Sequence, residues 1–223
     1  FPPFVMPEFE TEQLIVSPVS TAATADFAGA LALASVYYRK SNPDFADTAL
    51  AAAENAWNYL EQNTMQAFSN PSTVETGAYS DNSDADERYF AAAALCKAAG
   101  SKKYAAAAEK IRTSPAAAAW KEEYGWAQME AYADELILTN PGIFPSSLVN
   151  AAKKAVTNRA GELVSVSEKS GFGLTITEPE WGSSMEVLNN AHLLAAAYDV
   201  TKNKEYRNAA YAQVNYILGC NPV

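Results

Sequence analysis

The stretch TGAYSDNSDADERYFAAAALCKAAGSKKYAAAAEKI, residues 76–111, decides the fold. It places an acidic loop that carries a tyrosine before two helix-forming segments joined by a tight turn. The helical part of this pattern recurs in AYDVTKNKEYRNAAYAQVNYIL (197–218) and in SVYYRKSNPDFADTALAAAENAWNYL (35–60). A helical hairpin that repeats every 45 to 60 residues or so buries its apolar faces by stacking on its neighbours. The sequence therefore predicts an array or toroid of paired α-helices.

Four helical hairpins can be drawn along the chain, each with an apolar helix followed by a more charged, amphipathic one. Their helices are expected at 21–39 with 44–61, 85–99 with 102–112, 127–138 with 146–158, and 184–200 with 204–218. Alternation typical of β-strands occurs only at 163–167 and 172–177, which predicts no more than a short β-hairpin inside a loop. The sequence thus predicts an all-α fold with the apolar helices inside and the amphipathic helices outside.

The connections between these helices are unequal in length. Short turns lead from each apolar helix to its charged partner, whereas long segments lead into each apolar helix, at 1–20, 62–84, 113–126 and 159–183. With the apolar helices inside, the long segments gather on one face, at the N-terminal ends of the inner helices. We expect a binding or catalytic site on that face.

The composition limits the partners of this chain. It has 223 residues and a formal net charge of -10, which disfavours a nucleic-acid backbone or an anionic membrane surface. Asp26 and Arg39 interrupt the best apolar stretch, so no segment reaches the roughly 18 apolar residues that a membrane span needs. We expect a single domain over residues 1–223, with no nucleic-acid and no membrane partner. Because the chain opens at Phe1 without an initiator methionine and stops at Val223 just after a helix end, we expect a piece of a longer protein.

Three aromatic residues occur among polar neighbours in the long segments. They are Tyr79, Trp126 and Trp181. A sugar ring offers an apolar face to an aromatic ring and hydroxyl groups to carboxylates and amides, so this pattern is typical of a carbohydrate-binding cleft. The alternative is that each aromatic side chain simply packs its own loop.

The acidic run before the third expected hairpin also allows two interpretations. Asp84 followed by Glu87 forms a capping-box pattern, and carboxylates in a first helical turn are favoured by the helix dipole. The functional alternative is calcium, a hard cation that takes several oxygen ligands, here from Ser83, Asp86 and Glu87 with backbone carbonyls.

Other reactive side chains favour structural roles. Ser183 and Glu186 form a second capping-box pattern. His192 lies in an apolar helix with no cysteine or histidine at metal-ligand spacing, which favours a core histidine with its hydrogen bonds satisfied. Cys96 and Cys220 are expected as buried small hydrophobic residues and not as a disulfide.

Four collinear motifs resemble glycoside hydrolase family 9, the inverting endoglucanases. They are VSTAATADFAGALALAS (19–35), TGAYSDNSDADERYFAAAALCKAAG (76–100), EWGSSMEVLNNAHLLAAAYDVT (180–201) and NYILGCNP (215–222). The early FVMPE segment is similar to members that carry an N-terminal immunoglobulin-like domain. The resemblance covers essentially the whole chain. It implies part of an (α/α)6 barrel, about eight of its twelve helices, and secretion from the cell.

The resemblance also implies the reaction. In this family one carboxylic acid protonates the leaving oxygen while a second carboxylate activates water on the opposite face of the sugar. The family's base is an Asp of a DAGD-type motif upstream of the first matching segment, and its acid is a Glu downstream of the last. Neither motif is in this chain, so no catalytic residue is assigned to it.

The residues that do carry over from the family are peripheral. Tyr79, Trp126 and Trp181 match aromatic positions that line the family's cleft. A calcium site of some members corresponds to Ser83, Asp86 and Glu87 with the carbonyl of Asp81. Those members add a carboxylate where this sequence has Ala127, Gln128 and Met129, and losing an anionic ligand weakens a hard-cation site.

The sequence leaves three readings open. The first is part of a β-glucan hydrolase that needs no cofactor, completed by the remaining barrel helices and an immunoglobulin-like domain. The second is a non-catalytic glucan-binding or scaffold protein that keeps the cleft. The third is another toroid enzyme such as a polysaccharide lyase, which would need a Tyr, Lys or Arg base in the cleft. Binding of cello-oligosaccharide or β-glucan is expected under the first two.

Overall fold

A computed structural model describes residues 6–11, 15–72, 74, 77 and 79–221. Within these residues the chain forms eight α-helices and no strand. The helices are α1 (Thr21–Tyr38), α2 (Pro43–Gln62), α3 (Ala85–Ala99), α4 (Lys102–Arg112), α5 (Glu130–Thr139), α6 (Ser146–Ser167), α7 (Ser183–Thr201) and α8 (Lys204–Ile217). Short 3-10 helices lie at Pro7–Phe9, Pro115–Ala119 and Pro141–Ile143. The prediction of eight principal helices in an all-α fold is confirmed.

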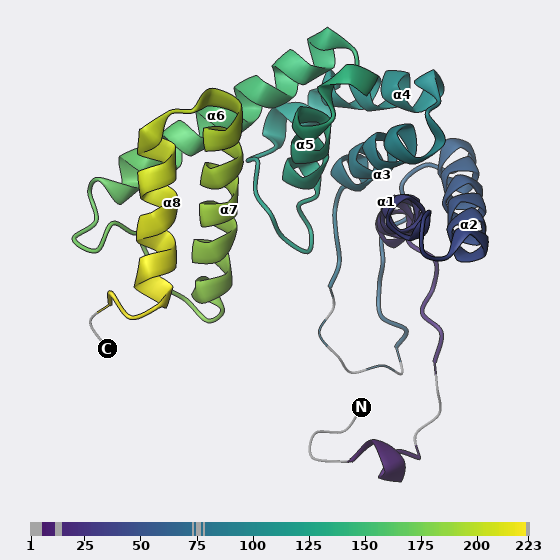
Figure 1. The fold of residues 1–223 in the computed structure, drawn as a ribbon. Helices are drawn as coiled ribbons and strands as arrows, with labels where there is room; N and C mark the ends of the chain where they lie inside the picture. The colour runs from purple at the N-terminus through teal and green to yellow at the C-terminus, as the bar shows by residue number, and fades with distance from the viewer. Residues whose placement is uncertain (1–5, 12–14, 73, 75–76, 78, 222–223) are drawn as a thin grey trace.

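The helices form a curved double layer (Figure 1). The apolar helices α1, α3, α5 and α7 follow the concave side of the curve, and α2, α4, α6 and α8 lie outside them. Consecutive helices pack as hairpins, and α3 also packs against both α1 and α5. The predicted division into inner and outer helices is therefore confirmed, and the described parts of the α2–α3 and α4–α5 connections lie on the open side of the curve.

Local signals fix where the helices begin and end. Ser20 Oγ accepts a hydrogen bond from the backbone N–H of Ala23 and caps α1. The side chain of Asn42 caps α2 in the same way, with Pro43 at the first helical position. Helix α3 ends at Gly100, whose positive φ of 65° is the left-handed conformation that glycine adopts without strain.

The main core surrounds α3. Ala91, Ala92, Ala93, Ala94 and Leu95 are all fully buried, because this helix is covered by neighbours on every side. Their small side chains permit close approach, and so does Gly29 on α1. A Cβ at Gly29 would lie 2.4 Å from Cε1 of Phe90, so α1 and α3 touch there with no room for a methyl group.

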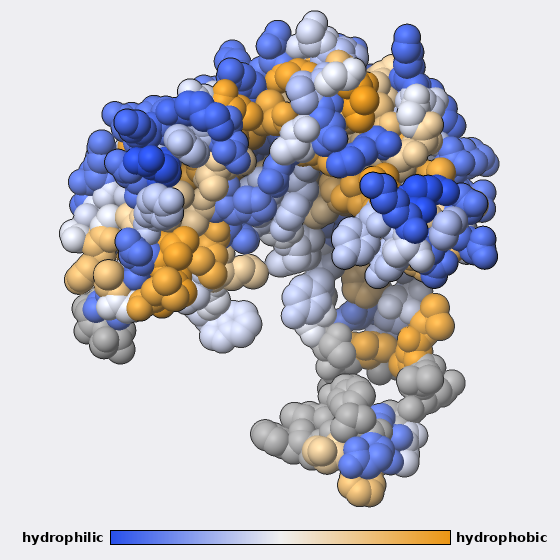
Figure 2. Space-filling model, viewed as in Figure 1, coloured by the Kyte–Doolittle hydropathy of each residue, from blue (hydrophilic) through white to orange (hydrophobic). Residues whose placement is uncertain are grey.

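The ends of the layer expose apolar side chains. Figure 2 shows apolar surface over α7 and α8 near the C-terminus. The large exposed apolar residues in or directly after these two helices are Met185, Leu188, Tyr211, Val214 and Leu218. Among the described residues no helix is long and apolar enough to span a membrane.

The predicted β-hairpin is wrong. Residues 163–167 continue α6 to Ser167, because Val156, Ala160 and Leu163 keep the helical spacing and are all buried. The segment 172–177 is irregular and is tied to Gln213 of α8, whose side chain accepts from the backbone N–H of Thr175 and donates to the carbonyl of Gly173. Burial against neighbouring helices outweighs the local β-propensity here.

Both predicted capping boxes are also wrong. Asp84 precedes α3, but its carboxylate pairs with Arg88 at 2.9 Å and makes no capping hydrogen bond. Ser183 is the first residue inside α7, after Gly182 in the left-handed conformation, and no side chain caps this helix. Of the two thiols, Cys96 is buried as predicted, whereas Cys220 is exposed; both are free.

Candidate functional site

Two of the three predicted sugar-binding aromatics meet at the open side of the helix layer. The rings of Tyr79 and Trp126 pack edge to face, with centroids 5.4 Å apart and an interplanar angle of 87°. Both stay exposed, at 71% and 57%. They come from different connections, the α2–α3 segment and the α4–α5 segment. The fold therefore brings two residues that are far apart in sequence into an exposed contact, which we call the aromatic pair.

A cavity of about 250 Å³ adjoins the aromatic pair. Its lining includes Asp26, Phe68, Tyr79, Asp81, Glu87 and Trp126. Glu87 is almost fully buried, and its Oε2 has no hydrogen-bond partner in the described part of the chain. Burial, followed by the charge of Asp86, raises the pKa of Glu87 to about 9 and that of Asp26 to about 6. The cavity thus combines aromatic rings with carboxyl groups that can bind hydroxyl groups.

Trp181 lies apart from the aromatic pair. It stands in the turn before α7, and its side chain is fully exposed, at 101%. Within the described residues it makes no aromatic ring contact. Packing therefore gives no account of this tryptophan, and its indole is free to contact a ligand.

The four residues predicted as calcium ligands lie at the N-terminal end of α3. They are Asp81, Ser83, Asp86 and Glu87. Two of their carboxylates are engaged by the protein itself: Asp81 accepts from the N–H of Ser83 at 2.9 Å, and Asp86 accepts from the N–H of Met129 at 3.0 Å. In the described residues no group of three or more Asp, Glu, His or Cys side chains could hold a metal ion. The predicted calcium site has only two carboxylates, Asp86 and Glu87, beside a hydroxyl and a backbone carbonyl, and it stays a prediction.

His192 is not the core histidine expected from its apolar helix. It is half exposed, and its ring stacks on Tyr124 with centroids 4.5 Å apart and an angle of 2°. Its Nε2 lies 3.1 Å from Oε1 of Glu135 on α5, and the Tyr124 hydroxyl donates to the other oxygen of Glu135 at 2.9 Å. The Glu135 carboxylate raises the pKa of His192, and the histidine lowers the pKa of Glu135. This contact joins α5 to α7.

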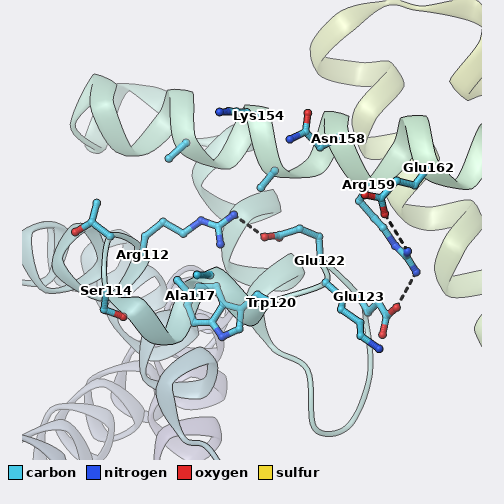
Figure 3. A pocket seen from close by; sticks show the side chains of 15 residues that line it. Arg112, Ser114, Ala117, Trp120, Glu122, Glu123, Lys154, Asn158, Arg159 and Glu162 are labelled. Carbon is cyan, nitrogen blue, oxygen red and sulfur yellow. Dashed lines mark hydrogen bonds and ion pairs between the residues drawn. The ribbon is translucent and has the colours of Figure 1, made fainter.

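A polar groove of about 1040 Å³ lies between the segment after α4 and helix α6 (Figure 3). Two successive glutamates of that segment point to different arginines. Glu122 Oε1 lies 2.5 Å from Nη2 of Arg112 at the end of α4. Glu123 Oε1 lies 2.7 Å from Nη2 of Arg159 on α6. These pairs could not be predicted from the sequence, because each joins two separate elements and no local pattern links them.

The helical pairs and their curvature define the class of fold, part of an (α/α)6 barrel. The model of the family described as Glycosyl hydrolase family 9 matches residues 6–223. The chain therefore belongs to glycosyl hydrolase family 9, as its motifs predicted.

Similar proteins agree with this assignment. A cellodextrinase of Butyrivibrio fibrisolvens is 33% identical over 98% of this chain and 42% of its own length. Endoglucanase D of Acetivibrio thermocellus is 30% identical over 98% of this chain and 35% of its own length. The structure of a thermostable endoglucanase mutant from Alicyclobacillus acidocaldarius matches with a TM-score of 0.90 and 30% identity, covering 100% of this chain and 42% of that chain. The chain thus spans well under half the length of the relatives it matches.

Proposed function

We propose that the protein carrying this chain hydrolyses β-1,4-glucosidic bonds in cellulose or related β-glucans. The observation that supports this most is the family match over residues 6–223, joined by relatives named cellodextrinase and endoglucanase. The proposed mechanism is the inverting one, in which one carboxylic acid protonates the leaving oxygen and a carboxylate activates water on the opposite face. Both of these carboxylates come from sequence outside this chain.

In this proposal the chain contributes substrate binding. The exposed rings of Tyr79 and Trp126 offer apolar surfaces to the CH face of a glucose unit, and Trp181 offers another further along. The carboxyl groups of Asp81 and Glu87 in the adjoining cavity can bind sugar hydroxyls. A solved relative, AaCel9A, is in complex with cellobiose-like isofagomine, which supports a cello-oligosaccharide as the ligand class.

Three further parts of the proposal start from family membership. We propose that the protein is secreted, that the remaining barrel helices cover the exposed apolar ends of the layer, and that an immunoglobulin-like domain precedes the barrel. The exposed side chains of α7 and α8 support the second of these, because large apolar patches usually mark a contact surface.

Activity measurements on the full-length protein test the proposed function. With cellopentaose and barley β-glucan we expect release of reducing sugar, and we expect none from the 223-residue chain alone because it lacks both catalytic carboxylates. A full-length protein that binds cellopentaose without cleaving it would instead be the non-catalytic glucan-binding protein. Turnover by the 223-residue chain would show that catalytic residues lie within it.

A further inference from the structure

Trp126 lies in a segment without regular backbone structure, residues 120–129, which we call the rim loop. It lies between the 3-10 helix Pro115–Ala119 and α5. Within the rim loop, one backbone hydrogen bond joins Gly125 N–H to the carbonyl of Gln128 at 3.3 Å. A loop with so few internal hydrogen bonds needs contacts from outside to adopt one conformation.

Those contacts come from every neighbouring helix from α3 to α7. The rim-loop residues involved, with their partners, are Glu122 with Arg112 of α4, Glu123 with Arg159 of α6, Tyr124 with Glu135 of α5 and Asn189 of α7, and Met129 with Asp86 of α3. Contacts on five helices fix the path of the chain on both sides of Trp126. The loop is held as a preformed support for the exposed indole.

Glu122 combines two energetically unfavourable features within the rim loop. Its φ is +55°, in the left-handed region that a non-glycine residue seldom adopts. Its carboxyl group is also buried, with the residue only 5% exposed. A strained backbone and a buried acid persist together only where the surroundings hold them, and such positions gather at functional sites.

The partners of Glu122 form a closed polar network. Nη2 of Arg112 lies 2.5 Å from Glu122 and 3.0 Å from Oδ2 of Asp134, so one guanidinium contacts two carboxyl groups. The hydroxyl of Tyr89 donates to the other oxygen of Asp134 at 2.5 Å. Glu130 on α5 is a third buried acid near this network, and burial, followed by the charge of Glu122, raises its pKa to about 7. The network therefore spans α3, α4 and α5 and closes on the rim loop.

The charges of this network favour keeping a proton on Glu122. One arginine faces two acids in a buried site, and a lone buried negative charge is costly. Burial first, and then the charge of Asp134, raise the pKa of Glu122 to about 8. Its Oε2 has no hydrogen-bond partner in the described part of the chain, so no donor there stabilises a negative charge on that oxygen. At neutral pH Glu122 is thus mostly a neutral acid.

We propose that Glu122 is a positioning residue for glucan binding: its contact with Arg112, which also binds Asp134, holds the rim loop in the conformation that presents Trp126 against Tyr79. It touches no sugar itself. Because its effect is on glucan affinity, the inference rests on the proposed function. It predicts that loss of the Glu122 side chain weakens binding by freeing the loop, while the rest of the barrel stays folded.

Two variants of the full-length protein, Glu122→Ala and Glu122→Gln, test this inference. Glutamine copies the shape and hydrogen bonds of the neutral acid, whereas alanine removes them. At pH 6 we expect cellotetraose to bind Glu122→Gln within about twofold of the unchanged protein and Glu122→Ala about tenfold or more weakly. Lys121→Ala, at the exposed neighbouring position, is the matched control and should bind normally.

A second readout does not depend on sugar. Protein labelled with 5-fluorotryptophan gives a 19F signal for Trp126, assigned by its loss in Trp126→Phe. We expect that signal to move and broaden in Glu122→Ala and to stay in place in Glu122→Gln. Failure of the unchanged protein to bind cellotetraose would defeat the proposed function, while the 19F signal would still decide the inference about the loop.

The pH dependence distinguishes positioning from simple packing. The pKa of Glu122 is raised in the folded protein, from 4.5 to about 8, so its stabilising contribution is present below pH 4.5 and is lost as pH rises through 8. We expect the Trp126 signal of the unchanged protein to shift as pH rises through about 8. In Glu122→Gln this step should be missing, and only the later titration of Glu87 in the adjoining cavity, whose pKa is about 9, should remain. An unmoved Trp126 signal in Glu122→Ala, or the same alkaline shift in Glu122→Gln, would overturn the inference. If Glu122→Ala does not fold, the glutamine comparison alone decides.

Discussion

Replacing Trp181 by alanine is expected to weaken glucan binding without changing the stability of the fold. The side chain is 101% exposed, so its removal leaves no cavity and breaks no packing. A glucose ring stacked on one face of an indole covers about 100 Å² of its apolar surface, roughly half of what a fully buried tryptophan contributes. At about 25 cal/mol per Å² this corresponds to about 2.5 kcal/mol, within an expected range of about 1–3 kcal/mol. The dissociation constant should therefore rise by about 5- to 150-fold.

Calorimetric titration of the full-length protein with cellotetraose measures this loss, and thermal melting measured in parallel checks the fold. Tyr37→Ala is a suitable control, since Tyr37 is 79% exposed but lies in the last turn of α1, away from the long connections. The control should bind cellotetraose normally. Unaltered binding by Trp181→Ala, together with a melting temperature several degrees lower, would show that Trp181 is a packing residue.

Three further predictions follow from particular contacts. In urea unfolding, Gly29→Ala should destabilise the protein by about 1–3 kcal/mol, because the added Cβ would clash with Phe90. Gly161→Ala is the control: its Cβ meets open space in α6, so it should stabilise the protein by about 0.5–1 kcal/mol. Equal effects of the two substitutions would contradict the close packing of α1 on α3. The His192–Glu135 contact should stabilise the fold most at pH values below the ordinary histidine pKa, and its contribution should be lost as pH rises through the raised pKa of His192 in the folded protein. Melting temperatures measured across this pH range should therefore fall by a small step that is missing in His192→Gln, and identical profiles would exclude the contribution. Adding calcium or a chelator should leave the melting temperature unchanged, and a calcium-dependent rise would show that the donors at α3 close around the ion after all.

The helices could be predicted from sequence because their signals are local. The fully apolar run Ala91–Ala94 can only lie inside a helical layer, and the Asn42-Pro43 pair marks a helix start. Both features depend on residues within one or two turns of each other. The end of α6 was predicted wrongly, because the helix continues to Ser167. This continuation depends on the burial of Leu163 within the helix layer, which cannot be inferred from the local sequence pattern.

The candidate site was only partly readable from sequence for the same reason. Tyr79 and Trp126 could be assigned to the open side of the layer because each stands before an inner helix, but their contact follows from the fold. The partners of Glu122 and His192 could not be found, since each joins two elements that are separate in sequence. Ion pairs and hydrogen bonds between separate elements produce no periodic pattern in the sequence. The conformation of the rim loop depends on such contacts, so it could not be predicted.

The stereochemistry of the first product tests the central claim most directly. Proton NMR of the full-length protein during cleavage of cellopentaose records which anomer is released before mutarotation mixes the two. An inverting family 9 enzyme acting on a β-1,4 bond should release the α-anomer first. Initial release of the β-anomer, or binding without any cleavage, would contradict the account.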